Sequence, residues 1–303
     1  MLSILITIAP LFLIILAGVI LRLTKIANDD WVSILNKFGL YGGFVPLVIY
    51  TLANTNRSEI FNLPMIGVNV GILLGVMLLA LFITKIFTVK TDLANNYITG
   101  IFFGNVAYLG FPFITSLYPA AGGLSSALIA IYLVVFLIFG VAILERQSLN
   151  KKKFSKVILK ALLHPLLLAV IIGSAILLLN IKLPAVLNDT LSILAKSSSP
   201  VVLVALGIFL AQKIKINADF WHALVISVIK LAILPALFFV VAYFAGFQLH
   251  WKISILDAGM PLAISMFAFT EVYALRKAVV ANTIIISTIL SVITLTGLAI
   301  LVR

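Results

Sequence analysis

Residues 95–119 read NNYITGIFFGNVAYLGFPFITSLYP, a stretch long and apolar enough to cross a bilayer. Its middle is interrupted by Gly104, Asn105, Gly110 and Pro112. Proline lacks a backbone donor and clashes with the preceding turn, and glycine adds freedom, so we expect the helix to break or kink here. In hydrocarbon, the backbone groups freed by a break must be satisfied by protein or by a water-filled cavity. The stretch therefore predicts a break enclosed by protein.

Residues 254–273, SILDAGMPLAISMFAFTEVY, have the same character around Gly259 and Pro261. At a rise of about 1.5 Å per residue, Asn105 and Pro261 each lie midway between the polar ends of their segments, near the bilayer centre. Interrupted hydrophobic segments in corresponding positions of two halves indicate a transporter's midplane binding site. Two crossing helices broken at one depth would present half-helix ends to a shared cavity, with N-terminal ends favouring an anion.

The composition excludes a soluble domain. Of 303 residues, 63% are hydrophobic and 10% are charged, and the mean hydropathy is +1.28. A spanning helix needs roughly 20 apolar residues, and the chain divides into apolar runs of this kind with almost nothing left over. We therefore predict an all-α integral membrane protein with ten transmembrane helices, at about 2–22, 31–53, 63–88, 97–117, 123–144, 155–179, 184–211, 220–246, 254–273 and 279–302.

The net charge of +12 does not indicate nucleic-acid binding, because the basic residues lie in short loops where orientation signals belong. Four lie on one side: Arg57, Lys182, Lys252 and Arg303. Thirteen lie near the odd-to-even connections: Arg22, Lys25, Lys85, Lys90, Arg146, Lys151, Lys152, Lys153, Lys156, Lys213, Lys215, Arg276 and Lys277. This asymmetry predicts cytoplasmic odd-to-even loops in a cell membrane, with both termini on the extracytoplasmic side.

Several kinds of chemistry are excluded or disfavoured by what the sequence lacks. There is no cysteine, which excludes disulfides and thiolate chemistry. No His/Glu metal pair or Asp dyad occurs in the spans, and no nucleotide-binding loop is present, so we expect no metal, no cofactor, no enzymatic activity and no ATP drive. The first segment has no basic residue before Arg22, unlike a signal peptide, and we expect it to remain in the mature protein.

The most charged connection, ERQSLNKKKFSK at residues 145–156, divides the chain almost in half with five runs on each side. Because five is odd, the halves enter the membrane from opposite faces, which predicts an inverted repeat if they are related. The second run of each half carries a central proline, Pro46 or Pro200, and the fourth run of each is interrupted. We assign residues 1–146 to the first repeat, 147–154 to a basic cytoplasmic linker and 155–303 to the second repeat.

The run from Gly104 to Pro112, GNVAYLGFP, resembles the Asn-x-Gly-x-x-Gly-x-Pro signature of the auxin efflux carriers, which are related to the bile-acid symporters. Met260-Pro261, with Glu271 ten residues on, is similar to the second signature of that family. The hydroxyl residues Ser287, Thr288 and Ser291 also fit, and the resemblance covers the whole chain. Ala107 stands where glycine is usual, and Leu262 where a small polar residue is common, which bears on the substrate more than on the fold.

The resemblance implies ten helices in two inverted five-helix repeats. Helices 1, 2, 6 and 7 would form a scaffold, usually a dimer interface, which implies a homodimer. Helices 3–5 and 8–10 would form a mobile transport domain, with helices 4 and 9 crossing at its centre. It further implies elevator-type movement of organic anions, small carboxylates in bacterial members and auxin in plants. The short central loop is typical of a bacterial-type member.

Asn105 is the first candidate for substrate contact, although a buried asparagine can also join two helices by hydrogen bonds. Pro112 and Pro261, with the neighbouring Gly110 and Gly259, are expected to shape the substrate-binding site. Tyr108, one turn from Asn105, could offer its hydroxyl to a carboxylate or could be a packed aromatic.

Three ionisable residues within or near the spans are candidates for coupling. Asp257, four residues before Pro261, could carry the coupling proton or could be a cap at the outer rim. Lys230 could pair with a transport-domain carboxylate or the substrate, or could extend to the membrane surface. Glu271 could act in coupling, or could form an ion pair at the cytoplasmic boundary with Arg276 or Lys277.

Together these patterns predict a secondary transporter of small organic anions, using alternating access and coupled to a proton or to the membrane potential, with lipid as its surroundings. A sodium-coupled carrier of larger amphipathic anions is the alternative in mechanism, although segments four and nine offer few sodium ligands. An intramembrane enzyme and a solute sensor that does not transport are alternatives of other classes. Sustained uphill flux would distinguish a carrier from a sensor.

Overall fold

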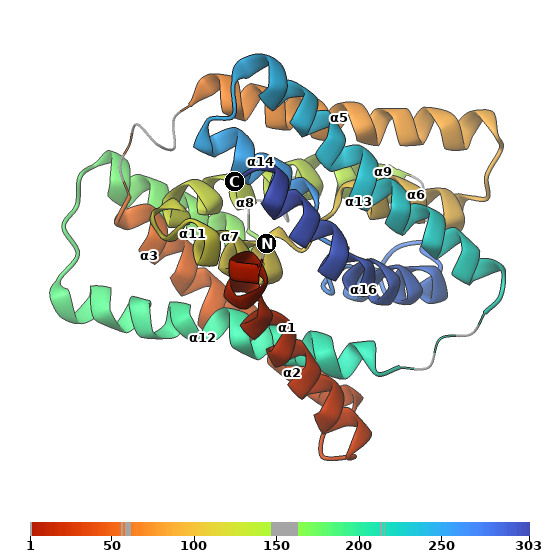
Figure 1. Ribbon diagram of the computed structural model, residues 1–303, viewed down its shortest axis with the longest axis horizontal. Helices are drawn as coiled ribbons and strands as arrows, with labels where there is room; N and C mark the ends of the chain where they lie inside the picture. Colours follow the sequence, from red (N-terminus) through yellow and green to blue (C-terminus); the bar gives the residue numbers. More distant parts are fainter. Residues whose placement is uncertain (1, 56, 58–61, 147–162, 213, 215) are drawn as a thin grey trace. The chain divides into compact units, whose positions relative to one another are not determined.

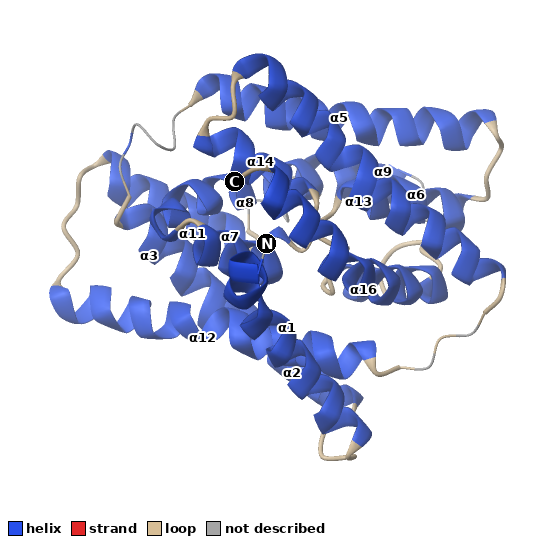
Figure 2. Ribbon diagram, in the orientation of Figure 1, coloured by secondary structure: helices blue, strands red, loops and turns tan. Residues whose placement is uncertain are grey.

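The computed structural model describes the chain except for residues 1, 56, 58–61, 147–162, 213 and 215. The basic linker assigned to residues 147–154 lies outside the described residues. Figure 2 shows helix throughout the described part, which contains no β-strand, only an isolated antiparallel bridge between Gly104 and Leu262.

Helices long and apolar enough to cross a membrane make this a multi-pass membrane protein. Among the described residues there are seven, at Ile4–Leu23, Asp29–Ala53, Leu63–Ile86, Pro119–Glu145, Ala185–Leu210, Ala218–Ala245 and Lys277–Leu301. Val106–Leu117 and Pro165–Leu178 are shorter apolar helices. The fourth and ninth sequence segments are not continuous helices, and the sixth begins among residues that are not described. Ten crossings and the inverted repeat stay predictions.

The chain forms two compact units that alternate along the sequence. The first unit comprises Met1–Leu63, Ala107–Ala130 and Leu162–Gln212, and the second comprises Pro64–Val106, Ile131–Ala161 and Lys213–Arg303. Each unit therefore takes elements from both halves of the chain. The fourth segment is shared, because its part up to Val106 belongs to the second unit and the rest to the first.

The first unit is built from paired helices. Its elements are α1 (Leu2–Leu23), α2 (Asp29–Phe38), the π-helical turn η1 (Gly39–Phe44), α3 (Val45–Ala53), most of the π-helical turn η2 (Val106–Gly110), α7 (Phe111–Leu117), the 3₁₀ turn η3 (Pro119–Ala121), the first part of α8 (Gly122–Val135), α11 (Pro165–Leu178) and α12 (Ala185–Leu210). Asn28 caps α2 by accepting a hydrogen bond from the Trp31 N–H at 3.4 Å, as its position before an amphipathic run indicates.

Glycines allow the helices of the first unit to approach closely. Where α1 crosses α12 (Figure 1), a Cβ built on Gly207 would lie 2.9 Å from the Cα of Gly18 and would overlap the carbonyl oxygen of Ile15. In the second segment, Gly43 packs against Ser198 of α12. Small residues at such a contact let two helices approach closely.

The second unit surrounds the two interrupted segments. Its elements are α5 (Leu63–Ile86), α6 (Thr91–Phe102), the end of α8, the π-helical turn η4 (Phe136–Gly140), α9 (Val141–Arg146), α13 (Ala218–Ala245), α14 (Leu249–Ala258), α15 (Met266–Phe269) and α16 (Lys277–Leu301). Helix α13 packs on α16, α14 and α6, so the helices that end at the breaks are held against one long continuous helix.

Candidate functional site

The two breaks meet within the second unit and satisfy each other's backbone groups. Helix α6 ends at Phe102 and α14 ends at Ala258. Beyond these ends, the Asn105 N–H donates to the Pro261 carbonyl oxygen at 2.7 Å, and the Ala263 N–H donates to the Phe103 carbonyl oxygen at 3.4 Å. Backbone freed from helical bonding inside a membrane needs such partners, so each break supports the other.

A hydroxyl on α16 completes this backbone network. The Leu262 N–H donates to the Ser287 Oγ at 3.1 Å. Ser287 is fully buried, like Ser291, and Thr288 is nearly so. The hydroxyls of Thr288 and Ser291 bond to carbonyls one turn back in α16. The serine-threonine stripe of the last segment therefore faces protein, and one of its members holds the second break.

Polar side chains of the second unit are buried beside the breaks with unsatisfied atoms. Asn105 is 1% exposed, and neither atom of its amide group has a hydrogen-bond partner in the described part of the chain. Asp257 is fully buried, and both of its carboxylate oxygens also lack hydrogen-bond partners among the described residues. The hydroxyl of Tyr132, on the end of α8, is a third such group. Buried polar atoms without hydrogen-bond partners are rare and costly in folded proteins. Their presence makes this place a candidate ligand-binding site.

Lys230 of α13 brings a positive charge to the same place. It is fully buried, and its Nζ donates to the Ala258 carbonyl oxygen at 3.3 Å, at the C-terminal end of α14. That end of a helix carries partial negative charge, which favours an ammonium group. Gly104 leaves room for it, because a Cβ there would lie 3.1 Å from Nζ. Asp257 directly precedes Ala258, so the ammonium lies at the end of the helix that carries this carboxyl group.

These observations locate four of the residues predicted from the sequence in one cluster: Asn105, Asp257, Lys230 and, through its carbonyl oxygen, Pro261. Gly259 follows the end of α14, where a Cβ would overlap the Leu298 side chain. Asp257 is fully buried, so it is not the solvated cap at the outer rim that was the alternative for it. Lys230 is fully buried too, so its side chain does not extend to the membrane surface. The helices that end at the breaks, α6 and α14, present their carbonyl ends there, and Lys230 supplies a positive charge beside them.

Glu271 lies apart from this cluster. Its carboxylate accepts a hydrogen bond from the Lys277 ammonium at 2.6 Å, and both side chains are more than half exposed. This geometry agrees with the ion pair that was the alternative to a coupling role. The neighbouring Arg276 instead joins Asp92 of α6 at 2.7 Å and Asp219 of α13 at 3.5 Å. The guanidinium lowers the pKa of the Asp92 carboxyl below its usual range.

Tyr108, Gly110 and Pro112 belong to the first unit. The buried Tyr108 ring packs edge-on against Phe44 with ring centroids 4.7 Å apart, the packed-aromatic arrangement considered for it. Gly110 ends the π-helical turn η2, which leads directly into α7. Pro112 lies in the first turn of α7 and lines a cavity.

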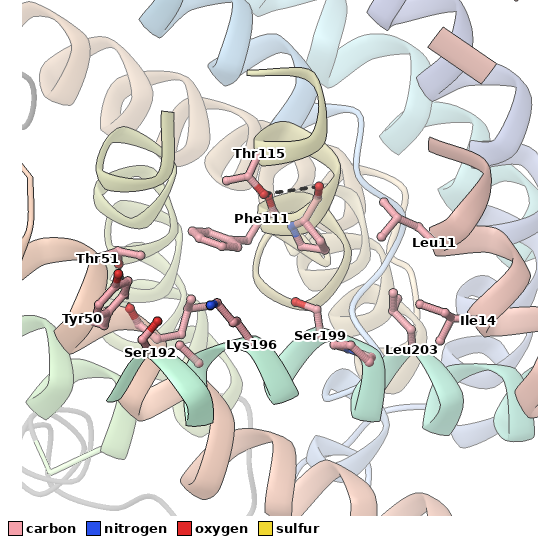
Figure 3. A pocket seen from close by; sticks show the side chains of 14 residues that line it. Leu11, Ile14, Tyr50, Thr51, Phe111, Thr115, Ser192, Lys196, Ser199 and Leu203 are labelled. Atoms are coloured by element: carbon pink, nitrogen blue, oxygen red, sulfur yellow. Dashed lines mark hydrogen bonds between the residues drawn. The ribbon is translucent and has the colours of Figure 1, made fainter. Parts of the chain in front are cut away.

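This cavity of the first unit has a volume of about 400 Å³ and is lined by α1, α3, α7 and α12 (Figure 3). Most of its wall is apolar. Its polar side chains are Tyr50, Thr51, Thr115, Ser192, Lys196 and Ser199. In Figure 3, Lys196 and Ser199 project from α12 toward the turn of α7 that carries Phe111 and Thr115. Lys196 is the positively charged residue among those that line the cavity.

Sequence reasoning missed Tyr132, because its apolar run gave no sign of a break or a polar partner. A single tyrosine in such a run is a usable signal, since a buried phenol normally requires a hydrogen-bond partner. It also missed the pairing of Asn95 and Asn96 with the start of α16. The Asn96 amide exchanges two hydrogen bonds of 3.0 Å with the backbone of Arg276, and Asn95 donates to the Ala274 carbonyl oxygen at 2.9 Å.

Comparison with known proteins shows the family of this chain. Residues 3–299 match the model of a family described as membrane transport protein. The chain belongs to this family, the auxin efflux carriers. The resemblance stated from the two signatures is thereby confirmed.

Two relatives are informative. One, from Rhizobium meliloti (strain 1021), is named "Putative malonate transporter" and is 31% identical over 144 residues, which cover 46% of this chain and 44% of that protein. The match thus spans less than half of that relative's length. An uncharacterized transporter of Methanocaldococcus jannaschii is 22% identical over 288 residues, covering 93% of each chain.

Proposed function

We propose that this protein is a secondary transporter that moves small organic anions, with carboxylates as the main class, through the cluster at the two breaks. The observation that carries the proposal is the burial of Lys230, Asp257 and Asn105 around two mutually hydrogen-bonded breaks. Ionisable residues buried in spanning segments are costly and mark the pathways of solutes and ions. Family membership and the name of the malonate-transporter relative agree with a carboxylate substrate.

Lys230 and Asn105 would bind the anion. An ammonium and an amide N–H₂ are both donors, and a carboxylate accepts hydrogen bonds from each. Hydrogen bonds to charged groups contribute about 1.5–3 kcal/mol each, enough for two such contacts to select an anion in a site closed to water. Gly259 and Pro261 would fix the conformation of the backbone around the bound anion.

The first unit would supply an anion contact of its own. Its cavity combines apolar walls with the Lys196 ammonium and with Pro112, one of the residues predicted to shape the site. Tyr108 and Gly110 would act by packing. A Lys196→Met variant should therefore raise the KM for a carboxylate, whereas Lys182→Met, which removes an exposed lysine at the end of a loop, should not.

Elevator-type alternating access is the mechanism we propose. The division of the chain into two units with separate internal contacts supports movement of a site-bearing unit as a body. The inverted repeat of residues 1–146 and 155–303, the homodimer and the extracytoplasmic termini belong to the same proposal. We place the protein in the cell membrane.

The test is uptake into liposomes containing the purified protein, with radiolabelled malonate, malate, lactate and indole acetate as probes and pH or sodium gradients imposed. We expect gradient-dependent accumulation of at least one carboxylate. Loss of one charge-assisted hydrogen bond in Asn105→Ala should weaken binding about tenfold to a hundredfold. Asn188→Ala, which removes an amide that pairs with Asn54 at 2.9 Å, is the control and should transport normally.

Two results would contradict the proposal. Normal transport by Asn105→Ala would show that the site lies elsewhere. Tight binding of an anion without flux under any gradient would favour the sensor.

A further inference from the structure

The ionisable groups of the buried cluster form a neutral set. Asp257 on α14 and Lys230 on α13 are both fully buried in the second unit and have opposite formal charges. Lys230 reaches the carbonyl end of α14, one residue after Asp257. The Asp257 carboxylate nevertheless accepts no hydrogen bond from a described residue, and the Lys230 ammonium has one weak bond of 3.3 Å to a carbonyl. The two formal charges therefore sum to zero, and neither side chain is saturated by hydrogen bonds.

Among the described residues, no hydrogen bond or ion pair joins either side chain to another formally charged group. The end of α8 contributes the buried phenol of Tyr132, and the first break contributes the neutral amide of Asn105. Helix α16 contains no ionisable residue after Lys277. Helix α5 contributes Asn69, whose amide donates to Ser254 at 3.0 Å. The other ionisable groups of α14, His250 and Lys252, lie in its first turn, at the opposite end from Asp257.

The energetics of burial restrict which states this cluster can occupy. An uncompensated charge in a spanning segment costs at least about 2.5–3.5 kcal/mol. If a carboxylate binds the Lys230 ammonium while Asp257 stays ionised, the cluster carries one net negative charge. If Asp257 takes up a proton, the ammonium compensates the bound carboxylate and the cluster is neutral again. The empty and loaded states are then both neutral, so both can move across the membrane.

We propose that Asp257 and Lys230 make this protein an electroneutral symporter that takes up one proton with each carboxylate charge and needs no sodium. The inference rests on the proposed function. An acid of the aqueous phase gives its proton to a carboxylate oxygen of Asp257, where an O–H bond forms, and Lys230 stays protonated throughout. On the other side the anion leaves and that O–H bond breaks, returning the proton to water. A dicarboxylate crosses as its monoanion or with a second proton.

The same geometry explains the independence from sodium. A coupling cation would bind among carbonyl and carboxylate oxygens, the ligands that hard cations prefer. The Lys230 ammonium already occupies the carbonyl end of α14 beside Asp257. An added metal ion would give the cluster an excess positive charge.

The experiment uses the full-length protein in liposomes, with radiolabelled malonate and lactate as probes and the membrane potential clamped by potassium and valinomycin. We expect accumulation driven by external acid, unchanged when choline replaces sodium. A potential of 100 mV should change the steady-state accumulation ratio of lactate less than twofold. A carrier that moves one net charge would change it about fiftyfold, because 100 mV contributes about 2.3 kcal/mol per charge.

Two variants separate the roles. Asp257→Asn has the shape of the protonated residue, so it should keep lactate binding and exchange but lose accumulation driven by pH. Its affinity should no longer depend on pH, whereas that of the parent should fall about tenfold per pH unit in the range where Asp257 of the empty carrier is ionised. Lys230→Met should lose lactate binding. The matched controls, Asp189→Asn and Lys182→Met, change exposed residues of the first unit and should behave like the parent.

The outcomes distinguish the two levels of the proposal. If the folded parent protein neither binds nor moves any carboxylate, the proposed function is wrong. If the protein moves lactate but requires sodium, or if a potential of 100 mV changes the accumulation ratio of lactate about fiftyfold, the proposed function stands and the electroneutral proton mechanism is wrong. The same holds if folded Asp257→Asn still accumulates lactate in response to pH. Should Asp257→Asn not fold, the potential and sodium measurements on the parent decide alone.

Discussion

The crossing of α1 and α12 allows a stability prediction whose size follows from the structure. A Cβ on Gly207 would overlap the carbonyl oxygen of Ile15 and lie 2.9 Å from the Cα of Gly18, whereas ordinary contact begins at 3.4 Å. All of these neighbours are backbone atoms, so no side chain can rotate away. In Gly207→Ala the two helices must separate locally by considerably more than about 0.5 Å, because the overlap with the Ile15 carbonyl oxygen is more severe than the contact with the Gly18 Cα, and the contacts around the crossing loosen. Overpacking of this kind typically costs about 1–3 kcal/mol.

The assay is thermal unfolding of the purified protein in detergent, followed by far-ultraviolet circular dichroism and by retention of the monodisperse peak on heating. We expect Gly207→Ala to unfold several degrees below the parent. The control is Gly75→Ala in α5, where an added Cβ would meet nothing within 4 Å. It should be neutral or stabilising by up to about 1 kcal/mol, because alanine is the better helix former. If Gly207→Ala were as stable as Gly75→Ala, the close approach of α1 and α12 would be refuted.

Two further predictions concern the second unit. In Gly104→Ala the new Cβ would lie 3.1 Å from the Lys230 Nζ, and the flexible lysine can move by a few tenths of an ångström, so we expect near-parental unfolding temperature but lactate binding weakened several-fold. Unchanged binding, measured beside Gly67→Ala, would show that the ammonium position is unimportant. Asp92→Asn should cost no more than about 1 kcal/mol at pH 7, because the ion pair with Arg276 is partly exposed. Since Arg276 lowers the pKa of Asp92 in the folded state, this contribution is present above the ordinary aspartate range and disappears as the pH falls through the folded pKa. The unfolding temperatures of parent and Asp92→Asn should therefore converge in acid, and a difference that persists there would contradict the assignment.

Local chemistry made the breaks predictable. The ends of α6 and α14 fall beside residues expected to interrupt them, Gly104 and Gly259. The rule is not sufficient by itself, because α12 and α13 continue through Pro200 and Pro235. The cap at Asn28 follows from an equally local rule. Family membership was visible for the same reason, since the signature residues lie together in the sequence.

The pairing of side chains could not be predicted in the same way. Hydrophobicity marks Lys230 and Asp257 as unusual within apolar runs, but it does not say that α13 brings the lysine to the end of α14. The location of the buried Tyr132 hydroxyl is likewise set by how the helices pack, which the sequence pattern does not show. The resemblance to the family implied an alternation of two units along the chain, but the place where the division falls within the fourth and fifth segments depends on long-range contacts that the residue pattern does not reveal.

The mutual hydrogen bonds of the two breaks have a consequence for biosynthesis. The Asn105 N–H is satisfied by the carbonyl of Pro261, which the ribosome adds 156 residues later. At about 5–20 residues per second, roughly 8–30 s pass between these events. During that interval the fourth segment cannot settle in lipid with its backbone satisfied, so it must wait beside water, the insertion machinery or a membrane chaperone. The nascent chain is thus most vulnerable to quality control between the completion of its fourth and ninth segments.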